Sequence, residues 1–136
     1  MTDRIKLTFE RGGQVTVTLL KEAAPETCRV VLDALPAEGE LIHAITSGEE
    51  VFASGFPAKE DVAQENSTID VKPGDIAYYD PAKSFCIFYG VGLPRSGIDE
   101  TSPVNVFGKA DDIEKMAEIG KRIRRQGVEK VQIEVA

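Results

Sequence analysis

The chain has 136 residues, of which 42% are hydrophobic, and its formal net charge is -7 at pH 7. This hydrophobic share is typical of a globular protein and too high for a disordered one. The negative charge argues against nucleic acid as the main partner, because a phosphate backbone requires a surplus of Lys and Arg on at least one face.

No hydrophobic run approaches the roughly 20 residues that span a bilayer, which argues against a membrane partner. The N-terminus enters a strand pattern directly, without the features of a signal peptide. The sequence therefore predicts a soluble, cytoplasmic protein. The two cysteines, Cys28 and Cys86, lie among hydrophobic residues, so we expect two buried free thiols rather than a disulfide framework.

The chain begins with a pattern typical of a β-hairpin. Ile5, Leu7 and Phe9 alternate with polar residues, and the same alternation returns over residues 15–19 after a Gly-Gly pair. Alternation with a period of two buries one face of a strand, and paired glycines supply the positive φ of a tight turn. Two antiparallel strands are therefore expected over the first 20 residues.

Two helices are predicted, far apart in the sequence. Pro25 suits the first turn of one helix, where a missing N–H costs nothing, and Pro36 ends that helix. The second helix begins after Asp111, which can cap it with Glu114 three residues later in a capping-box relation. Gly127 supplies the exit from this second helix.

Between and after the helices, the pattern is that of strands and turns. Residues 84–90 are hydrophobic almost throughout, which indicates a central strand covered on both faces. Residues 91–103 form a long loop rich in Gly and Pro. The strands are expected near residues 40–46, 49–54, 67–71, 75–79, 84–90, 104–108 and 128–135. Eight or nine short strands with two helices predict a mainly β protein, built as a closed antiparallel barrel capped by helices.

Several short motifs resemble the cyclophilin superfamily. Ala24-Pro25-Glu26-Thr27 is similar to the Ala-Pro-x-Thr that opens the first cyclophilin helix. The segments 74–79, 86–90 and 102–108 resemble uncharacterised prokaryotic families of that superfamily. The resemblance covers nearly the whole chain in the same order. It implies one cyclophilin-like domain over residues 1–136, with a closed antiparallel cyclophilin-like β-barrel and two α-helices.

The same resemblance argues against prolyl isomerase activity. Active cyclophilins carry Phe-His-Arg-Val in the strand after the first helix, and the arginine is thought to hydrogen-bond the twisting prolyl amide. Here the matching stretch is Leu41-Ile42-His43-Ala44-Ile45, so Ala44 stands in place of the arginine. Without that donor, little of the rotation barrier of about 18–20 kcal/mol would be removed. Arg95, in the long loop, is the one candidate replacement.

No catalytic residue, metal site or cofactor is predicted. His43 is the only histidine, and a site with one histidine, even with Glu50 or Glu65 nearby, binds zinc or iron poorly. No Ser/His/Asp or Cys/His set can be assigned from spacing, because such partners meet only in space.

Five residues are the best candidates to line a ligand-binding cleft. Glu65 and Asn66 belong to a polar run that enters a strand, although such a run can equally satisfy backbone groups in a turn. His43 lies in a hydrophobic strand, where a structural role is the alternative. Tyr79 and Tyr89 combine a hydrophobic ring with a polar hydroxyl that suits the wall of a cleft.

Three functional hypotheses follow. The leading one is a binding module for a small molecule or short peptide, without substantial prolyl isomerase activity. The second is a peptidyl-prolyl isomerase or another enzyme with rebuilt active-site residues. The third is an oligomeric interaction protein, in which strand edges or the 91–103 loop pack against another copy to form a homo-oligomer.

Overall fold

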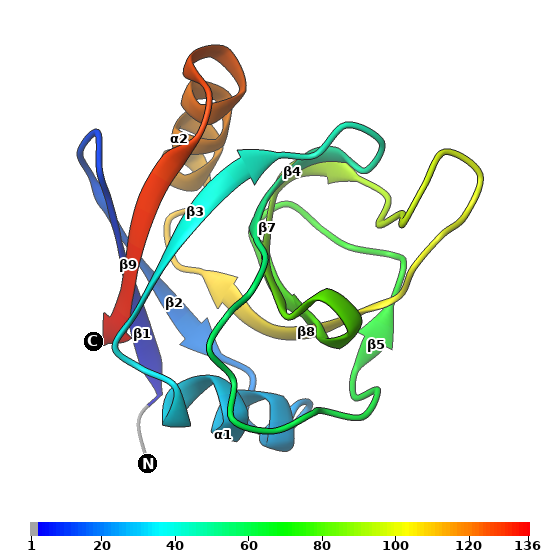
Figure 1. Ribbon diagram of the computed structural model, residues 1–136. Helices are drawn as coiled ribbons and strands as arrows, with labels where there is room; N and C mark the ends of the chain where they lie inside the picture. Colours follow the sequence, from blue (N-terminus) through cyan, green and yellow to red (C-terminus); the bar gives the residue numbers. More distant parts are fainter. Residues whose placement is uncertain (1–2) are drawn as a thin grey trace.

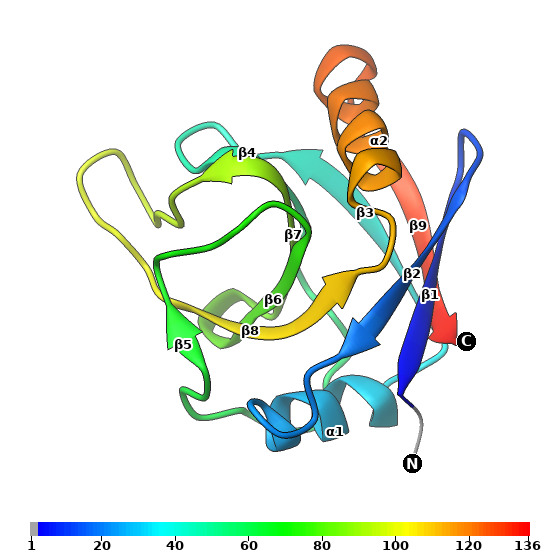
Figure 2. The same cartoon turned by 180° about the vertical axis from the view of Figure 1, so that it is seen from behind.

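A computed structural model describes residues 3–136 and shows nine β-strands, two α-helices and one short 3₁₀ turn in that range (Figure 1 and Figure 2). In chain order the elements are β1 (Arg4–Phe9), β2 (Gln14–Leu19), α1 (Pro25–Asp33), β3 (Ala37–His43), β4 (Gly48–Ala53), β5 (Ser67–Thr68), β6 (Asp75–Tyr79), the turn η1 (Asp80–Ala82), β7 (Ser84–Gly92), β8 (Val104–Ala110), α2 (Ile113–Gln126) and β9 (Glu129–Val135).

Eight of the strands form a closed antiparallel barrel in the order β2-β1-β9-β3-β4-β7-β6-β8. The pairing of β2 with the end of β8 closes it, and the two-residue strand β5 pairs with the start of β8, on the edge opposite β6. The helices α1 and α2 lie near opposite ends of the barrel (Figure 1). This architecture confirms the prediction of a mainly β fold with two helices on a closed barrel.

Hydrophobic side chains fill the barrel interior, as the period-two alternation requires. Along β1 and β2, every second residue is buried and its neighbours face outward. Both helices contribute to the same core, α1 through Cys28 and Val31 and α2 through Met116 and Ile123. Each fully buried side chain of this size contributes about 1.5–3 kcal/mol of hydrophobic free energy.

A second, smaller hydrophobic cluster lies on the outer face of the barrel. Phe85 and Ile87 of β7 belong to the interior core, whereas the alternate residues Cys86 and Phe88 pack outward. Strand β7 is therefore covered on both faces, as its continuous hydrophobic run predicts. The outer cluster consists of Val71, Ala77, Cys86, Phe88, Val104 and Val106. Both cysteines are buried and free.

Several strand boundaries differ from the sequence-based expectation. Strand β3 ends at His43 rather than at residue 46, and β7 extends to Gly92, so the long loop expected over residues 91–103 begins at residue 93. Strand β3 begins at Ala37 rather than at residue 40, because residues 37–41 pair with β9. Strand β5 is limited to Ser67–Thr68, since the Thr68 hydroxyl accepts the backbone N–H of Asp70 and turns the chain. Strand β8 extends to Ala110, because its last residues pair with β2 and close the barrel.

The prediction that Asp111 caps the second helix is wrong by one residue. Asp112 is the N-cap, and its carboxylate accepts the backbone N–H of Lys115 at 3.0 Å. Asp111 still belongs to the barrel edge: its own N–H donates to the Thr16 carbonyl, and its carboxylate accepts the Thr16 hydroxyl. The predicted exit at Gly127 is confirmed by its φ of 91°.

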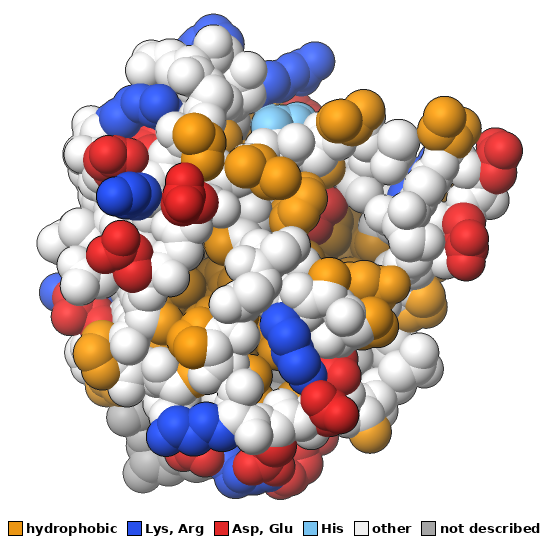
Figure 3. All heavy atoms as spheres, in the orientation of Figure 1, with side chains coloured by type: hydrophobic (Ala, Val, Ile, Leu, Met, Phe, Trp, Pro, Cys, Tyr) orange, Lys and Arg blue, Asp and Glu red, His pale blue; other side chains and the backbone are white. Residues whose placement is uncertain are grey.

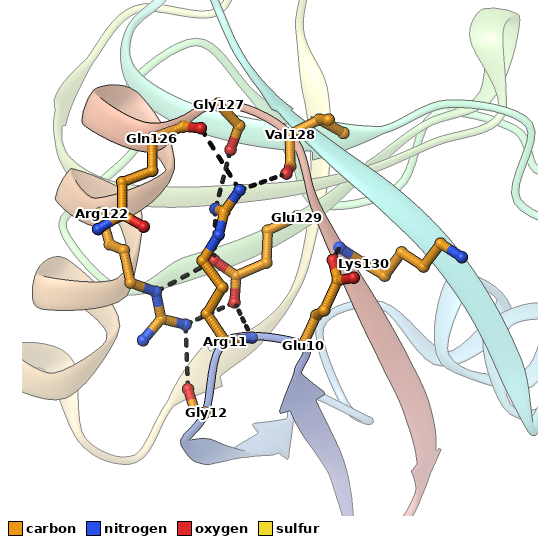
Figure 4. A network of polar contacts seen from close by, with 9 residues as sticks. All are labelled: Glu10, Arg11, Gly12, Arg122, Gln126, Gly127, Val128, Glu129 and Lys130. Carbon is orange, nitrogen blue, oxygen red and sulfur yellow. Dashed lines mark hydrogen bonds and ion pairs between the residues drawn. The ribbon is translucent and has the colours of Figure 1, made fainter.

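A buried carboxylate joins three separate parts of the chain (Figure 4). The Glu129 side chain is fully buried, and it accepts hydrogen bonds from the guanidinium groups of Arg122 and Arg11. Arg11 also donates to the carbonyls of Gly127 and Val128. The network thus ties the β1–β2 turn to the end of α2 and to the start of β9. Burial raises the pKa of Glu129, but the hydrogen bonds and positive charges of the two arginines outweigh it and hold the pKa below its ordinary value.

We predict that Glu129→Gln lowers the free energy of unfolding by about 3 kcal/mol at pH 7, because it removes the charge that compensates two arginines. Glu134→Gln, on the same strand but in an exposed pair with Lys6, should change it by about 0–1 kcal/mol. Urea unfolding measures both variants. If the two variants had equal free energies of unfolding, the structural role assigned to Glu129 would be contradicted.

The same group predicts a dependence on pH. A lowered folded-state pKa stabilises the fold above the unfolded pKa of about 4.3, and this contribution is lost as pH falls through the folded pKa. The difference between wild type and Glu129→Gln should therefore shrink in acid.

Candidate functional site

A cavity of about 330 Å³ lies on the outer face of the barrel. Its floor is formed by outward-facing residues of neighbouring strands, among them Phe52 of β4 and Cys86 of β7, which are directly opposite in the ladder. Val104 of β8 extends this floor. One wall is the loop over residues 93–103, which projects from the barrel (Figure 1). Figure 3 shows hydrophobic side chains gathered in the hollow between the barrel and this loop.

Ser47, in the turn between β3 and β4, holds the projecting loop in place. Its carbonyl accepts the N–H of Leu93 at 3.0 Å, and its hydroxyl accepts the N–H of Arg95 at 3.1 Å. The next residue, Gly48, has a φ of 80°, and a Cβ there would lie 2.7 Å from the Val91 carbonyl oxygen. Only glycine allows the β3–β4 turn to approach the end of β7 this closely, so the turn and the start of the loop are fixed relative to each other.

Glu50 of β4 is the one carboxylic acid that lines the cavity, within the described range 3–136. The register between β4 and β7 shifts from Gly48 to Glu50, which marks a β-bulge beside this residue. A bulge re-aims the side chains next to it. Glu50 therefore faces outward into a site that the loop covers, and only 6% of its surface is exposed.

The environment of Glu50 is unusual for a carboxyl group. Burial raises its pKa to about 7, and polar contacts with the Cys86 thiol and the Ser47 hydroxyl offset only part of this effect. None of the ion pairs formed within residues 3–136 includes Glu50. A carboxyl that changes charge near pH 7 inside a cavity can act as a proton donor, a proton acceptor or an anionic binding group.

Among the described residues, Arg95 is the only Lys or Arg that lines this cavity. Its guanidinium donates to the carbonyl of Ile98 at 2.7 Å, within the same loop. Its positive charge is thus held by the loop and forms no ion pair with Glu50.

Three of the five residues predicted from the sequence lie at or behind this cavity. His43 and Tyr79 line it. Tyr89 is 2% exposed and lies inside the barrel, where its hydroxyl donates to Nε2 of His43 at 2.7 Å. The Nδ1 atom of His43 donates to the Ala44 carbonyl at 2.7 Å, so both ring nitrogens are occupied. Tyr89 therefore orients His43 and does not itself line the cavity.

The other two predicted residues lie elsewhere. The Glu65 carboxylate accepts the backbone N–H groups of Glu26 and Thr27 and the Thr27 hydroxyl. It thereby caps α1, whose own N-cap residue, Ala24, has no side-chain oxygen. Asn66, with a φ of 47°, donates to the Val106 carbonyl. Glu65 and Asn66 thus satisfy backbone groups, which was the alternative to a ligand-binding role. The five residues predicted to line a cleft do not converge on one concavity.

No group of three or more His, Cys, Asp or Glu side chains within residues 3–136 is arranged to hold a metal ion. None of the helices in the described part of the chain is long and hydrophobic enough to cross a membrane.

Comparison with known proteins places the chain in a family. Residues 7–135 match the family described as "Protein of unknown function (DUF3830)". The chain belongs to this family. No protein with a curated description matches the sequence.

Solved structures show that this DUF3830 member has the cyclophilin-like fold. It resembles McbB in complex with tryptophan, with a TM-score of 0.79 and 17% identity over 96% of the chain, although it spans only 44% of McbB. It resembles the hypothetical protein AF2241 from Archaeoglobus fulgidus, with a TM-score of 0.68 and 29% identity over 99% of this chain and 95% of that one.

A third similar structure is a cyclophilin-type peptidyl-prolyl cis-trans isomerase from Cryptosporidium parvum, solved with the dipeptide Ala-Pro. The TM-score is 0.62, with 11% identity over 98% of each chain. The resemblance to cyclophilins inferred from the sequence is confirmed at the level of the fold.

In the sequence of this DUF3830 member, Glu50 is not predicted as a site residue and stands out only as a possible neighbour of a metal at His43. The signal was present in Gly48-Glu49-Glu50-Val51-Phe52, where two successive glutamates at the start of a strand place one carboxyl on each face. What the sequence did not show is the loop that covers one of these faces.

A glycine in α2 makes room for the tyrosine that orients His43. A Cβ on Gly120 would lie 2.3 Å from ring atoms of Tyr89. We predict that Gly120→Ala lowers the free energy of unfolding by about 1–3 kcal/mol, through overpacking, although alanine alone favours a helix by about 1 kcal/mol. It should also shift the imidazole NMR signals of His43, because Tyr89 must move.

The matched control is Gly97→Ala in the projecting loop, where no atom lies within 4 Å of the added methyl group. Urea unfolding compares the two variants. A Gly120→Ala protein as stable as this control, with unchanged His43 signals, would show that the helix yields to the methyl group without disturbing Tyr89.

Proposed function

We propose that this protein binds a small molecule or short peptide in the outer-face cavity and has no substantial prolyl isomerase activity. The observation that carries the proposal is Glu50, a buried carboxyl that faces a mostly hydrophobic cavity and has no ion-pair partner among residues 3–136. A concave, largely hydrophobic pocket with a few convergent polar groups and a perturbed pKa is the usual form of a ligand site.

The energetic cost of Glu50 supports a functional role. Removing a carboxylate from water costs several kcal/mol unless charges or hydrogen bonds compensate it. An apolar residue at this position would extend the floor that Phe52 and Cys86 already form. A ligand that contacts the carboxyl offers a physical reason for an acid at this position.

Two of the similar structures support the size of the proposed ligand. McbB was solved in complex with tryptophan, and the Cryptosporidium cyclophilin in the presence of a dipeptide. Ligands of this size are compatible with a cavity of about 330 Å³. The exposed Ile45 and Ile98 beside it could contact a longer peptide, or a second copy of the chain, so the oligomeric hypothesis remains a prediction.

Prolyl isomerase activity is a second candidate, favoured by one observation: Arg95 lines the same cavity as two aromatic residues, Phe52 and Tyr79. Against it, the guanidinium of Arg95 is bonded to Ile98 in its own loop, and Ala44 supplies no donor on the other side. A donor that must leave an existing hydrogen bond stabilises a transition state less than a preorganised one.

We therefore predict that a coupled peptide assay shows no acceleration of prolyl isomerisation above the uncatalysed rate. Arg95→Ala should leave that rate unchanged. Turnover that Arg95→Ala abolishes would establish the rebuilt isomerase instead, and an active cyclophilin in parallel reactions controls for the assay.

Binding itself can be tested without knowing the natural ligand. We predict that an NMR screen of small fragments shifts the amide signals of residues 42–54, 79–86 and 94–104, which surround the cavity. Signals of α1, at one end of the barrel, are the internal control and should not move. A screen in which no fragment shifts the cavity signals would contradict the proposed function.

A further inference from the structure

We infer that the ligand of the outer-face cavity is an organic cation, an amine that is protonated at neutral pH and attached to a hydrophobic body, with its ammonium group against Glu50. This inference rests on the proposed function and names the chemical class of the ligand.

Charge is unbalanced inside the cavity. Glu50 is buried, and within residues 3–136 no basic side chain forms an ion pair with it. Of the basic residues that share the cavity, Arg95 directs one guanidinium nitrogen to the Ile98 carbonyl of its own loop, and His43 has both ring nitrogens in hydrogen bonds. A buried carboxylate is stabilised when an opposite charge lies against it, and here the ligand is the available source of that charge.

The cavity also supplies hydrogen-bond acceptors. An ammonium group has three N–H donors and no acceptor. Besides the two oxygens of Glu50, the cavity presents the hydroxyls of Ser47, Ser54 and Ser84. The hydroxyls of Ser54 and Ser84 are 2.9 Å apart and bond each other, which leaves acceptor capacity on both. An amine can therefore bond both to these hydroxyls and to Glu50, whereas the ionised carboxyl of Glu50 would repel a ligand carboxylate or phosphate.

The remaining surface of the cavity is largely hydrophobic. Phe52, Ile42 and Val104 line the cavity with hydrophobic groups, and Pro94 adds a further apolar face from the loop. These groups suit an aryl or alkyl body attached to the amine. A free ammonium ion or a polyamine would leave this surface uncovered.

The charge state of Glu50 makes the inference testable through pH. The groups that face Glu50 are Ser47 from the β3–β4 turn, Cys86 from β7 and, along the cavity, His43, Tyr79 and Arg95. Because burial raises the pKa of Glu50 to about 7, its ionised fraction rises about tenfold between pH 6 and pH 8. An amine prefers the ionised form, so its affinity should rise by about this factor over the same interval.

The experiment uses 2-phenylethylamine as the probe and 2-phenylethanol as a neutral control of the same shape. Isothermal titration calorimetry of the wild-type protein should show that the amine binds more tightly than the alcohol and gains about tenfold in affinity from pH 6 to pH 8. Glu50→Gln should abolish both the preference for the amine and its pH dependence. The matched control is Glu49→Gln, on the same strand but outside the cavity lining, and it should behave as the wild type.

Three results would overturn the inference: equal affinity for amine and alcohol, an amine affinity that falls as pH rises, or an amine preference that persists in Glu50→Gln. The second result would mean that Glu50 donates its proton to a neutral ligand. If Glu50→Gln does not fold, the pH dependence of the wild type decides between these outcomes. If other fragments shift the cavity signals in the NMR screen but amines do not bind, the inference fails and the proposed function stands. If no fragment binds, both fail.

Discussion

The antiparallel pairing of β4 with β7 determines both the core and the candidate site. In this ladder Val51 lies opposite Ile87, and both side chains belong to the barrel interior. The alternate pair, Phe52 and Cys86, faces outward and forms the cavity floor. One register thus sets the two faces, and a slip of one residue would exchange them. The bulge before Glu50 is the local departure from this register that positions a carboxyl in the covered part of the outer face.

Two buried glutamates show how the surroundings set the role of a carboxyl. Glu129 accepts hydrogen bonds from two guanidinium groups, and its pKa is lowered. Glu50 is covered to a similar extent, but within residues 3–136 its polar contacts are a thiol and a hydroxyl without a guanidinium or ammonium group, and its pKa is raised. The first joins distant segments of the chain and stabilises the fold. The second lowers stability in its ionised form, which is common where a protein keeps a group for binding rather than for folding.

The sequence predicted the parts of the fold that depend on local pattern. The alternation of β1 and β2, the continuous hydrophobic run of β7 and the glycine after α2 each have one simple structural solution. The cap of α2 was misplaced, because Asp111 and Asp112 are equally good caps until the pairing of residue 111 with β2 is known. The candidate site was predicted only in part, since it depends on which polar residues the barrel brings together.

Glu65 and Asn66 illustrate the difficulty. They form a polar run that resembles a ligand rim in sequence, but their partners are Thr27 and Val106, about 40 residues away in either direction. Glu50 was overlooked for the converse reason: nothing within four residues of it shows that the 93–103 loop will cover it. Contacts between distant segments set both outcomes, and a single sequence carries no direct record of them.

The charge of Glu50 also separates the two functions that the cavity could support. A twisting prolyl amide is stabilised by a hydrogen-bond donor, so the carboxyl could assist rotation only in its protonated form, below the pKa of about 7. An ammonium ligand requires the ionised form, above it. Amide rotation and ammonium binding therefore depend on pH with opposite signs. Measuring how each activity changes with pH distinguishes the two functions within one protein. Above this pKa the anion predominates, and an anion in a hydrophobic cavity attracts a cation but provides no donor for amide rotation.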